Sequence, residues 1–553
     1  MNESLKKIIT ISSIIFSLSA FALMLILFKH HAALVTEVQK VTSLHDEKAQ
    51  ATSATSAPAR SISSKSNNTW LDIQKDVKDT VVQVFSHVTE FNWLEPYKTP
   101  EQGEGVGSGF FINENGDIIT NYHVVAQASG IEIQIPSFGL ERFDVSIIGV
   151  CPERDIALLT LAKDAKNSII AKNITIPHLK LGDSDAVLRS QEVLALGYPL
   201  GQTRLKSTLG IVSGRESGYI QITAPLNPGN SGGPALDTNG DVIGINSRGI
   251  LEAQNIGYII PINEVKSTLK DLYKVKLLRK PALGGLFTFA SPELTHYLDN
   301  PDGGGGYIAK VFPETLLDNA GIKEGDMLYE INGYRVDRYG DIDVPWSEDK
   351  ASLPEFLNRL MVDSNIHLVI YRSGKRMDIK TKFKLSYLPP TRMIYPEFEQ
   401  AAIDYEVLGG MVVMSLSLNH VGLLLQRQPN LIRYSKAESQ HEPAVIITNI
   451  LPNSQAFKAR VLRPSQLITE VNGEKIKTLN DFRAAILKSK TSRYITIQTD
   501  ENYYSVLSID KILAEEDILA ARYFFEKSPL LKQFEIPVQH DTKKINSVVQ
   551  KTP

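Results

Sequence analysis

Three side chains that together can cleave an amide bond occur in the order His123, Asp155 and Ser231 along this 553-residue chain. A serine hydroxyl is a weak nucleophile until a neighbouring base takes its proton. Histidine suits that task near neutral pH, and a buried aspartate fixes its tautomer and stabilises the imidazolium. The three residues are therefore candidates for a nucleophile, its base and the group that orients the base.

The serine lies in a glycine-rich segment, residues 227–234. Glycine lets the backbone turn sharply, so that successive N–H groups can point at one place. We expect the N–H groups of Gly229 and Ser231, with Asn230 as a further candidate, to bind the oxyanion that develops during attack. One such donor contributes about 3 kcal/mol of transition-state stabilisation.

The His123 and Asp155 segments alone are each more typical of ordinary structure than of catalysis, and the Ser231 segment alone could be a turn between strands. Their joint occurrence within one block of short strands favours a catalytic site. Short β-branched and apolar runs separated by turns indicate an all-β barrel or sandwich. The runs lie at 80–85, 107–112, 118–120, 131–135, 144–150, 156–161, 193–197, 209–213, 219–223, 242–246 and 257–260.

Residues 75–275 resemble the trypsin-like protease domain of the HtrA/Deg family. The resemblance rests on the segments around the three candidates and on further motifs at 196–201, 208–213, 243–246 and 255–261. It implies two perpendicular six-stranded β-barrels with the triad in the cleft between them. It also implies an ATP-independent endopeptidase for unfolded or misfolded proteins, with His123 as base, Asp155 as its orienter, Ser231 as nucleophile and Gly229 in the oxyanion hole.

Three further positions near the triad carry expectations. Ile245, Asn246 and Ser247 are expected to line the primary specificity pocket, and the resemblance implies small or medium aliphatic substrate side chains there. Tyr122 stands beside the base, where the family usually has a small or polar residue. Cys151, the one cysteine of the chain, is expected to be a small buried hydrophobe rather than a redox or nucleophilic group.

A weak internal repeat follows the protease-like block. A strand, a proline turn, a short helix and a strand closed by Asn-Gly occur twice, with 139 residues between Pro313 and Pro452 and 140 between Asn332 and Asn472. Both copies resemble PDZ domains. In the first, a backbone loop for a peptide carboxylate is expected at Leu283, Gly284, Gly285 and Leu286. The second copy shows no evident loop of this kind, so an architectural role is favoured for it.

These patterns divide the chain. We expect an anchor or signal segment at 1–31, a flexible tether at 32–69, a protease domain at 70–278 and a first PDZ-like domain at 279–388. A connecting segment at 389–439, a second PDZ-like domain with a helix at 440–530 and a disordered tail at 531–553 complete the division. The carboxyl-terminal region resembles that of plant-type Deg proteases. The expected fold class is mainly β, with α+β PDZ-like domains and an amino-terminal transmembrane helix.

The amino end decides the expected compartment. Residues 8–28 are uncharged and largely apolar, which is long enough to span a bilayer as a helix. An uncleaved anchor is favoured over a cleaved signal. The bulk of the chain is then exported, to the periplasm if the source is bacterial.

Composition excludes several other classes. The net charge of −3 gives no basic excess for nucleic acid, and one cysteine cannot form an intramolecular disulfide. No metal-ligand spacing and no nucleotide or dinucleotide motif occurs, so no metal or cofactor is expected.

Other functions and the oligomer remain open. A PDZ-bearing chaperone or scaffold with a silent barrel is one alternative, and a regulatory protease that cleaves a specific membrane partner is another. The resemblance implies a homo-oligomer, a trimer or a multiple of it. Phe91, Trp93 and Tyr97 are candidate contacts for it, with surface or core packing as the alternative.

Overall fold

The computed structural model describes residues 70–171, 175–249 and 255–534. The expected anchor at 8–28 and the tether at 32–69 lie outside this range, as do residues 535–553. No helix within the described ranges is long and apolar enough to cross a bilayer.

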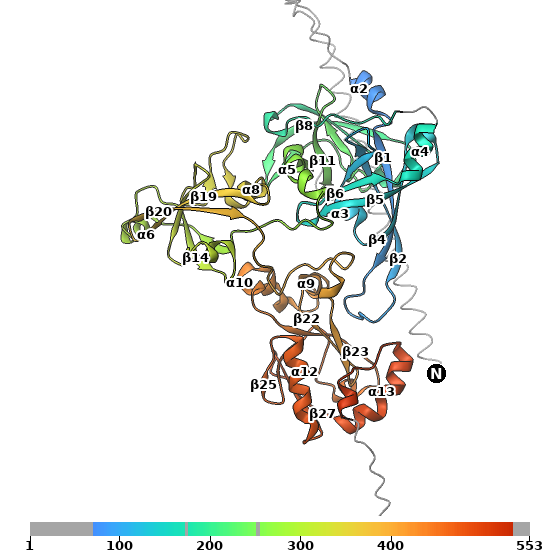
Figure 1. Cartoon of the computed structure of the whole chain (residues 1–553), viewed down its shortest axis with the longest axis vertical. Coiled ribbons are helices and arrows are strands. Elements are labelled where there is room, and N and C mark those ends of the chain that lie inside the picture. The colour runs from blue at the N-terminus through green and yellow to red at the C-terminus, as the bar shows by residue number, and fades with distance from the viewer. Residues whose placement is uncertain (1–69, 172–174, 250–254, 535–553) are drawn as a thin grey trace, which may run out of the picture. The chain divides into compact units, whose positions relative to one another are not determined.

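The first half of the protease block closes into a six-stranded barrel with strand order β1-β2-β3-β6-β5-β4 (Figure 1). Its interior is filled by β-branched and aromatic side chains, which suit the pleated, buried surface of a strand. Closure removes the free edges that a flat sheet would expose. The strands are β1 (Val81–Glu90), β2 (Glu101–Phe111), β3 (Asp117–Thr120), β4 (Ala128–Gln134), β5 (Arg142–Cys151) and β6 (Ile156–Leu161).

The second half closes into another six-stranded barrel with order β10-β11-β12-β9-β8-β7. One buried cluster joins residues of both barrels, among them Phe110, Leu158, Leu196 and Ile245. The strands are β7 (Glu192–Gly197), β8 (Lys206–Glu216), β9 (Tyr219–Ile222), β10 (Pro234–Leu236), β11 (Val242–Gly249) and β12 (Gly257–Pro261). The mainly β, double-barrel fold expected for this block is confirmed.

Helices are few in the protease block and sit at the barrel ends or between strands. The α-helices are α2 (Trp70–Val77), α3 (Tyr122–Val125), α4 (Lys163–Ala171) and α5 (Ile262–Leu272), and the 3₁₀ turns are η1 (Pro136–Phe138), η2 (Pro152–Arg154), η3 (Ser184–Ala186) and η4 (Pro199–Gly201). The short α3 and η2 matter for function, because α3 contains His123 and η2 directly precedes Asp155.

The next sheet has the order β13-β14-β15-β19-β20, with β16 beside β15 and a separate β17–β18 pair. Its β13 is an edge strand. The strands are β13 (Gly285–Thr288), β14 (Gly306–Val311), β15 (Met327–Ile331), β16 (Tyr334–Arg335), β17 (Asp341–Ile342), β18 (Ala351–Ser352), β19 (Ser364–Arg372) and β20 (Lys375–Phe383). The helices are α6 (Pro292–Tyr297), α7 (Leu316–Asn319) and α8 (Leu353–Asn358).

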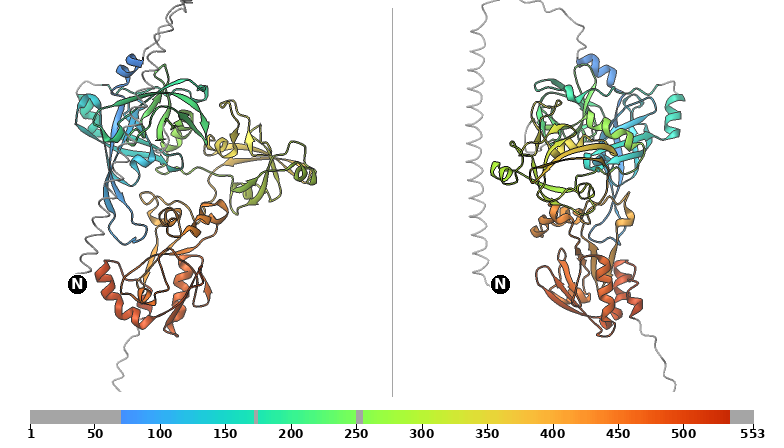
Figure 2. Two further views of the ribbon diagram at one scale, coloured as in Figure 1. Left: turned by 180° about the vertical axis from the view of Figure 1, so that it is seen from behind. Right: turned by 60° about the vertical axis from the view of Figure 1, so that its left-hand side comes forward.

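The last sheet has the order β21-β22-β23-β24-β26-β27, with β25 beside β24. Its helices α12 and α13 contact strands of the same sheet (Figure 2). The strands are β21 (Tyr405–Leu408), β22 (Met411–Ser415), β23 (Val445–Ile450), β24 (Leu467–Val471), β25 (Glu474–Lys475), β26 (Tyr494–Thr499) and β27 (Tyr504–Ser508). The helices are α9 (Leu418–Leu424), α10 (Ala437–Gln440), α11 (Gln455–Ala459), α12 (Leu479–Leu487) and α13 (Ile509–Tyr523), with 3₁₀ turns η5 (Gln400–Ala402), η6 (Pro429–Ser435), η7 (Lys488–Lys490) and η8 (Leu531–Gln533).

Two boundaries differ from those expected. Strands β21 and β22 come from the expected connecting segment 389–439, yet they pair into the same sheet as the later strands. The start of the expected tail is also ordered, because Leu531 and Phe534 are buried in the core of this sheet. The apolar run of β22 buries its side chains only by joining β23, so the sheet extends beyond residues 440–530.

Both sheets contain the same glycine turn. Gly284 has φ +85°, and an added Cβ would lie 2.1 Å from Cβ of Thr315. Gly410 has φ +81°, and an added Cβ would lie 2.0 Å from Cβ of Ser454. The segment 408–411 therefore has the same glycine turn as 283–286, a similarity that the sequence pattern of the second copy did not indicate.

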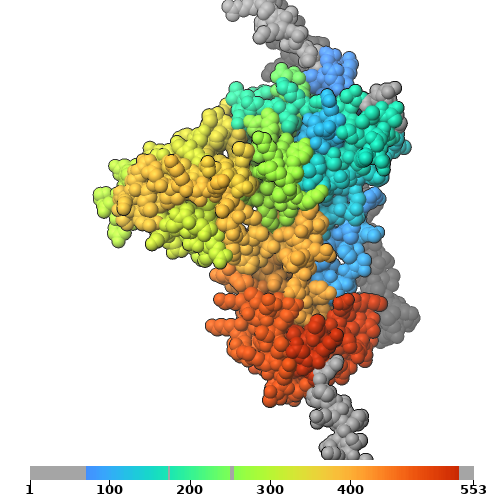
Figure 3. All heavy atoms as spheres, viewed as in Figure 1, coloured from blue at the N-terminus to red at the C-terminus, as the bar shows by residue number. Residues whose placement is uncertain are grey.

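The aromatic residues expected at an oligomer contact are packed within the chain. Trp93, in the loop between β1 and β2, is 6% exposed and lies edge-to-face on His420 at 5.3 Å between ring centroids. Tyr97 contacts Phe525 in the same manner at 5.8 Å. Figure 3 shows this loop (blue) against the carboxyl-terminal part of the chain (orange to red). Core packing, the alternative interpretation, is what the structure shows for Trp93.

The buried Glu516 on α13 gives the stability of the chain a pH dependence. Burial raises the pKa of this carboxyl to about 7, and the Gly409 backbone and Lys527 only partly offset that effect. The folded state therefore binds the proton more tightly than the unfolded state, so stability falls as pH rises from about 4.5 to about 7, by up to about 3 kcal/mol. We expect Glu516→Gln to raise the unfolding temperature at pH 8.

Scanning calorimetry of the full chain at pH 8 and at pH 4.5 checks this prediction. The gain from Glu516→Gln should nearly vanish at pH 4.5, where the wild-type carboxyl is already protonated in the native state. Glu526→Gln, at an exposed glutamate, is the matched control and should change little at either pH. An equal gain at both pH values would contradict a titration of Glu516.

Candidate active site

His123 and Asp155 are brought together by two short helical turns. His123 lies on α3, and Asp155 follows η2 in the left-handed region at φ 55°. Nδ1 of His123 is 2.8 Å from Oδ2 and 3.0 Å from Oδ1 of Asp155. The backbone N–H of His123 also donates to Oδ1 at 2.9 Å. The carboxylate therefore fixes both the ring and the main chain of His123, which leaves Nε2 for a proton transfer.

Neighbouring residues hold Asp155 in turn. The buried Asn121 donates from Nδ2 to the Asp155 carbonyl at 2.9 Å. Oγ of Ser247 lies 3.4 Å from Oδ2 of Asp155 and donates to it. The preceding residue, Arg154, forms a buried ion pair of 2.5 Å with Glu264 on α5. These contacts constrain the loop on both sides of the aspartate.

Tyr122, beside the candidate base, contacts a segment that follows the first PDZ-like sheet. Its hydroxyl donates to Oε1 of Glu397 at 2.6 Å, and its ring lies edge-to-face on Tyr395. Burial raises the pKa of the Tyr122 hydroxyl well above its ordinary value, and the hydrogen bond to Glu397 adds to this effect. The tyrosine noted as a departure from the family pattern thus ties the His123 helix to residues 395–397.

Ser231 lies in the same cavity as His123, but its hydroxyl has another partner. Oγ of Ser231 donates to the carbonyl of Ser247 at 2.9 Å. Within the described residues, no hydrogen bond joins it to His123. A serine side chain changes rotamer in picoseconds to nanoseconds, and catalytic hydrogen bonds are often formed only with substrate bound. The arrangement is therefore a resting geometry from which Oγ can turn to the base.

The turn before Ser231 presents two N–H groups. The Pro228 carbonyl accepts a hydrogen bond from Leu200 N–H at 2.6 Å. Because C=O and N–H point in opposite directions across a trans peptide, the N–H of Gly229 faces away from Leu200. Gly229 has φ +98°, and a Cβ there would lie 2.3 Å from the Tyr198 carbonyl. Only glycine fits this turn without a shift of the backbone.

Asn230 differs from its two neighbours. Its N–H donates to the Asn227 carbonyl at 3.0 Å, and its side chain is buried outside the cavity. The N–H groups of Gly229 and Ser231 donate to no protein acceptor in the part of the chain that the structure describes. The geometry favours these two, rather than Asn230, as donors to an oxyanion.

The cavity around Ser231 has a volume of about 410 Å³. Asn246 and Ser247 line it as expected, but Ile245 does not, because its side chain is buried in the core shared by the barrels. Asn246 Nδ2 donates to the Leu196 carbonyl at 2.9 Å and so holds the cavity floor. Sequence reasoning missed several lining residues, namely Val88, Gly105, Val106, Val124, Leu226, Asn227, Pro228, Arg248 and Gly249.

The expected carboxylate loop lies at the start of β13. Leu283 is buried, and its carbonyl accepts from Leu317 N–H at 3.0 Å. The Gly284 carbonyl accepts from Phe312 N–H at 2.9 Å and from Oγ1 of Thr315 at 3.1 Å. These bonds fix the loop beside an edge strand to which an extended peptide can add.

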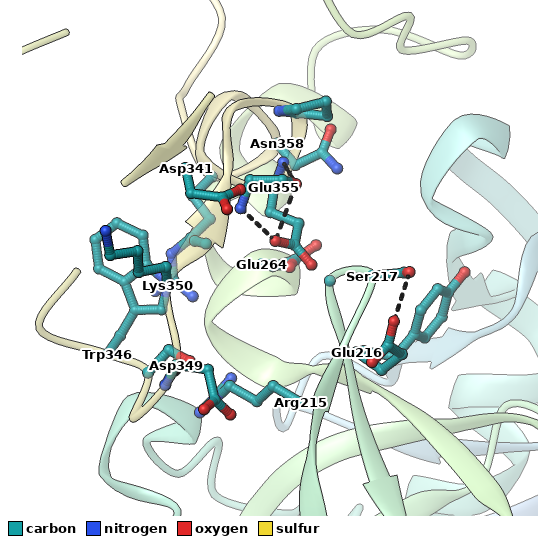
Figure 4. A pocket seen from close by; sticks show the side chains of 17 residues that line it. Arg215, Glu216, Ser217, Glu264, Asp341, Trp346, Asp349, Lys350, Glu355 and Asn358 are labelled. Carbon is teal, nitrogen blue, oxygen red and sulfur yellow. Dashed lines mark hydrogen bonds between the residues drawn. The ribbon is translucent and has the colours of Figure 1, made fainter. Parts of the chain in front are cut away.

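A separate cavity of about 560 Å³ lies between the β8–β9 turn and residues 341–359 (Figure 4). Its wall carries charged side chains of both signs, including Arg215, Glu264, Lys350 and Glu355. It contains none of the three candidate catalytic residues, and Arg359 on its rim pairs with Asp185 at 2.6 Å. The cavity therefore belongs to a contact between two parts of the chain.

Metal chemistry has no evident site in the described ranges. No group of three or more His, Cys, Asp or Glu side chains there is arranged to hold an ion. Cys151 is fully buried, and burial raises the pKa of its thiol to about 12. A thiol that stays protonated is a poor nucleophile, in agreement with the expected structural role.

Comparison with known proteins gives consistent matches. The family described as "Trypsin-like peptidase domain" matches residues 107–245, and "PDZ domain" matches residues 395–528. A probable periplasmic serine endoprotease DegP-like from Marinomonas sp. (strain MWYL1) is 25% identical over 427 residues, covering 75% of this chain and 81% of the relative. The periplasmic serine endoprotease DegP of Salmonella typhimurium is 32% identical over 297 residues, covering 51% of this chain and 57% of the relative.

A structure described as HtrA-type protease AlgW with decapeptide is similar at 22% identity and a TM-score of 0.45, covering 58% of this chain and 100% of that one. The putative serine protease HhoB of Synechocystis sp. (strain ATCC 27184 / PCC 6803 / Kazusa) is 30% identical over 269 residues, covering 45% of this chain and 61% of the relative. The double barrel and the sequence relatives define a trypsin-like serine endopeptidase. The trypsin-like peptidase domain, the PDZ domain and the DegP-like relatives are together consistent with the HtrA/Deg family of serine proteases.

Proposed function

We propose that the chain is an ATP-independent endopeptidase that degrades unfolded or misfolded proteins by a His123–Asp155–Ser231 triad. One observation carries the proposal: Asp155 fixes His123 through Nδ1 and through the main chain, in the cavity that also holds Ser231. The names of the DegP-like relatives support an endopeptidase, and the family resemblance of residues 75–275 supports the substrate class.

The proposed chemistry follows from the geometry. Oγ of Ser231 leaves the Ser247 carbonyl and attacks the substrate carbonyl carbon, while Nε2 of His123 takes the hydroxyl proton. The N–H groups of Gly229 and Ser231 stabilise the oxyanion of the tetrahedral intermediate. The imidazolium, stabilised by Asp155, then gives its proton to the leaving amine as the C–N bond breaks. Water repeats the sequence on the acyl-enzyme, which releases the acid and restores Ser231.

Labelling with a fluorophosphonate tests the nucleophile directly. The full chain should take up one phosphonate, and peptide mapping should place it on Ser231, with casein cleavage lost in parallel. Chain unfolded in urea before labelling is the control and should not react. Labelling of another serine, or none while casein is still cleaved, would overturn the triad.

We further propose that the first PDZ-like unit binds the C-termini of peptides and that the second does not. The reason is the difference between their equivalent strands. β13 is an edge strand, whereas β22 pairs with β23 on one side and with β21 on the other. β21 therefore fills the position at which an incoming peptide strand would pair with β22.

The two glycine turns supply a matched pair of variants for this proposal. Gly284→Ala and Gly410→Ala each introduce a Cβ with almost the same clash at a positive φ. We expect Gly284→Ala to weaken binding of a peptide with a free hydrophobic C-terminus by more than about tenfold, and Gly410→Ala to leave it unchanged. Fluorescence anisotropy measures the affinities, and circular dichroism checks that both variants fold.

The opposite ranking, with binding lost only in the Gly410 variant, would assign the peptide to the second unit. A peptide with an amidated C-terminus is the control for carboxylate capture. The amidated peptide should bind weakly to the wild type and to both glycine variants.

The domain boundaries, location and assembly belong to the same proposal. We place the protease unit at 70–278 and the first PDZ-like unit at 279–388, and we begin the second near residue 395. Export with an anchor at 8–28 is supported by that segment's apolar length and by the periplasmic relatives. A homo-oligomer is supported by family resemblance, but Trp93 is an unsuitable contact since it is buried within its own chain.

A further inference from the structure

Arg248 places a positive charge on the wall of the catalytic cavity. It lines the same cavity as His123 and Ser231, and its side chain is exposed. Its guanidinium carbon lies 4.9 Å from the ring centroid of Tyr219 and 5.8 Å from that of Tyr258. Stacking on two aromatic rings attracts a cation and restricts its motion. The positive charge of Arg248 therefore stays in one region of the cleft, because the guanidinium is held against the two rings and does not move freely in solvent.

A β-bulge aims this side chain. The pairing of β11 with β12 shifts register between Asn246 and Arg248, which makes Ser247 the additional residue, and Arg248 then stands opposite Tyr258. Bulges next to active sites commonly re-aim a side chain. The same bulge presents the Ser247 carbonyl to Oγ of Ser231. The position of Arg248 is thus coupled to the geometry of the nucleophile.

Two acidic groups whose charges act on Tyr219, Asp155 and Glu264, are already engaged. Asp155 accepts from His123, and Glu264 is paired with Arg154 in the protein interior. Across the described ranges, Arg248 forms no ion pair with a carboxylate of the chain. A carboxylate supplied by a substrate would therefore meet a guanidinium whose charge the described part of the chain leaves unneutralised.

The strand that carries Arg248 has an open side along the cavity. β10 pairs with β11 only as far as Ile245, opposite Pro234. Residues 247–249 continue beyond that pairing and line the cavity. An extended substrate can add to such an edge through main-chain hydrogen bonds, and side chains opposite one another on paired strands lie about 5 Å apart at Cβ. The Cβ of Arg248 would therefore lie about 5 Å from the Cβ of a substrate residue paired opposite it.

We propose that Arg248 is a specificity-determining residue that selects substrate segments with an aspartate or glutamate in the stretch that pairs with residues 247–249. This inference rests on the proposed endopeptidase function. An exposed pair of this kind gives a modest preference, which we expect to be about fivefold in kcat/KM and to fall as salt rises.

The test uses matched fluorogenic peptides that carry Asp, Asn or Lys at each of several positions on the amino side of the cleaved bond. The wild-type chain should cleave the Asp peptide about fivefold more efficiently than the Asn peptide at one position, with the difference in KM. Arg248→Gln should remove the preference, Arg248→Lys should keep part of it, and Arg248→Glu should favour Lys. Arg204→Gln, at an exposed arginine of the same barrel outside this cavity, should leave the preference intact.

Two results would overturn the inference. One is equal cleavage of the Asp and Asn peptides by the wild-type chain, and the other is an Asp preference that survives in Arg248→Gln. The proposed function fails by a different result, namely no cleavage of any peptide together with no phosphonate on Ser231. The two failures are therefore distinguishable in one set of measurements.

Discussion

Ser231→Ala is expected to abolish proteolysis, with kcat lowered by about 10⁶-fold on casein and on peptide substrates. The variant removes the atom that forms the bond to the substrate carbonyl, and no other hydroxyl can replace it within the cavity in the described structure, where Ser247 Oγ is held by Asp155. The hydroxyl makes one hydrogen bond, to the Ser247 carbonyl. Its loss should therefore leave the fold intact.

Initial rates on fluorescent casein, with circular dichroism as a check of folding, measure this effect. Ser137→Ala, at an exposed serine of η1, is the matched control and should cleave like the wild type. Unchanged cleavage by Ser231→Ala would remove Ser231 from the mechanism. If neither the wild type nor Ser231→Ala cleaves casein, but both suppress aggregation of unfolded casein, the chaperone alternative gains support.

Asp155→Asn should lower kcat by about 10⁴-fold with little loss of stability. Asparagine has the same shape and tolerates the positive φ of this position, so the loop can keep its conformation. Its amide NH₂ can face Nδ1 of His123 and hold the ring in the tautomer whose Nε2 carries the proton. That nitrogen can then no longer accept the proton of Ser231.

Single-turnover kinetics and phosphonate labelling measure this loss, since both report the acylation step. Asp164→Asn, on the first turn of α4, is the control for a charge change on the same barrel and should have wild-type rates. Wild-type labelling of Ser231 in Asp155→Asn would mean that Asp155 does not orient the base.

Strand length and turn residues are local signals, so an all-β barrel or sandwich could be anticipated from the residues themselves. The double barrel and the pairing of His123 with Asp155 could be anticipated from the family resemblance. The resting position of the Ser231 hydroxyl could not. It depends on a bulge that brings the Ser247 carbonyl within 2.9 Å, and one additional residue in a strand leaves no mark in the sequence. Ile245 was expected in the cavity beside its two neighbours, but its side chain joins the core shared by the barrels, whereas residues 246–249 line the cavity.

The glycine loop of the second PDZ-like sheet was missed because the repeat was followed at a fixed offset. The proline turns and the Asn-Gly turns of the two copies are separated by 139 and 140 residues, respectively. Gly284 and Gly410 are separated by fewer residues, because the segment between the glycine loop and the proline turn is longer in the second copy. Only the packing of Gly410 against Ser454 in the structure identified this glycine as the counterpart of Gly284.

Trp93 shows a further limit of sequence patterns. An aromatic residue in a loop suits an oligomer contact or a core equally well. Its partners His420 and Met414 lie more than 300 positions along the chain. No local pattern encodes a contact at that separation, so only the tertiary structure decides between the two.

Strand β21 also has a consequence for solubility. β22 carries the fully or nearly buried run Met411, Val412, Val413 and Met414, and a hydrophobic strand with an open edge is a template for aggregation. By pairing with β22, β21 caps that edge with a strand of the same chain. Under the proposed function the chain meets many unfolded segments able to add to an open edge, and this sheet offers them none at β22.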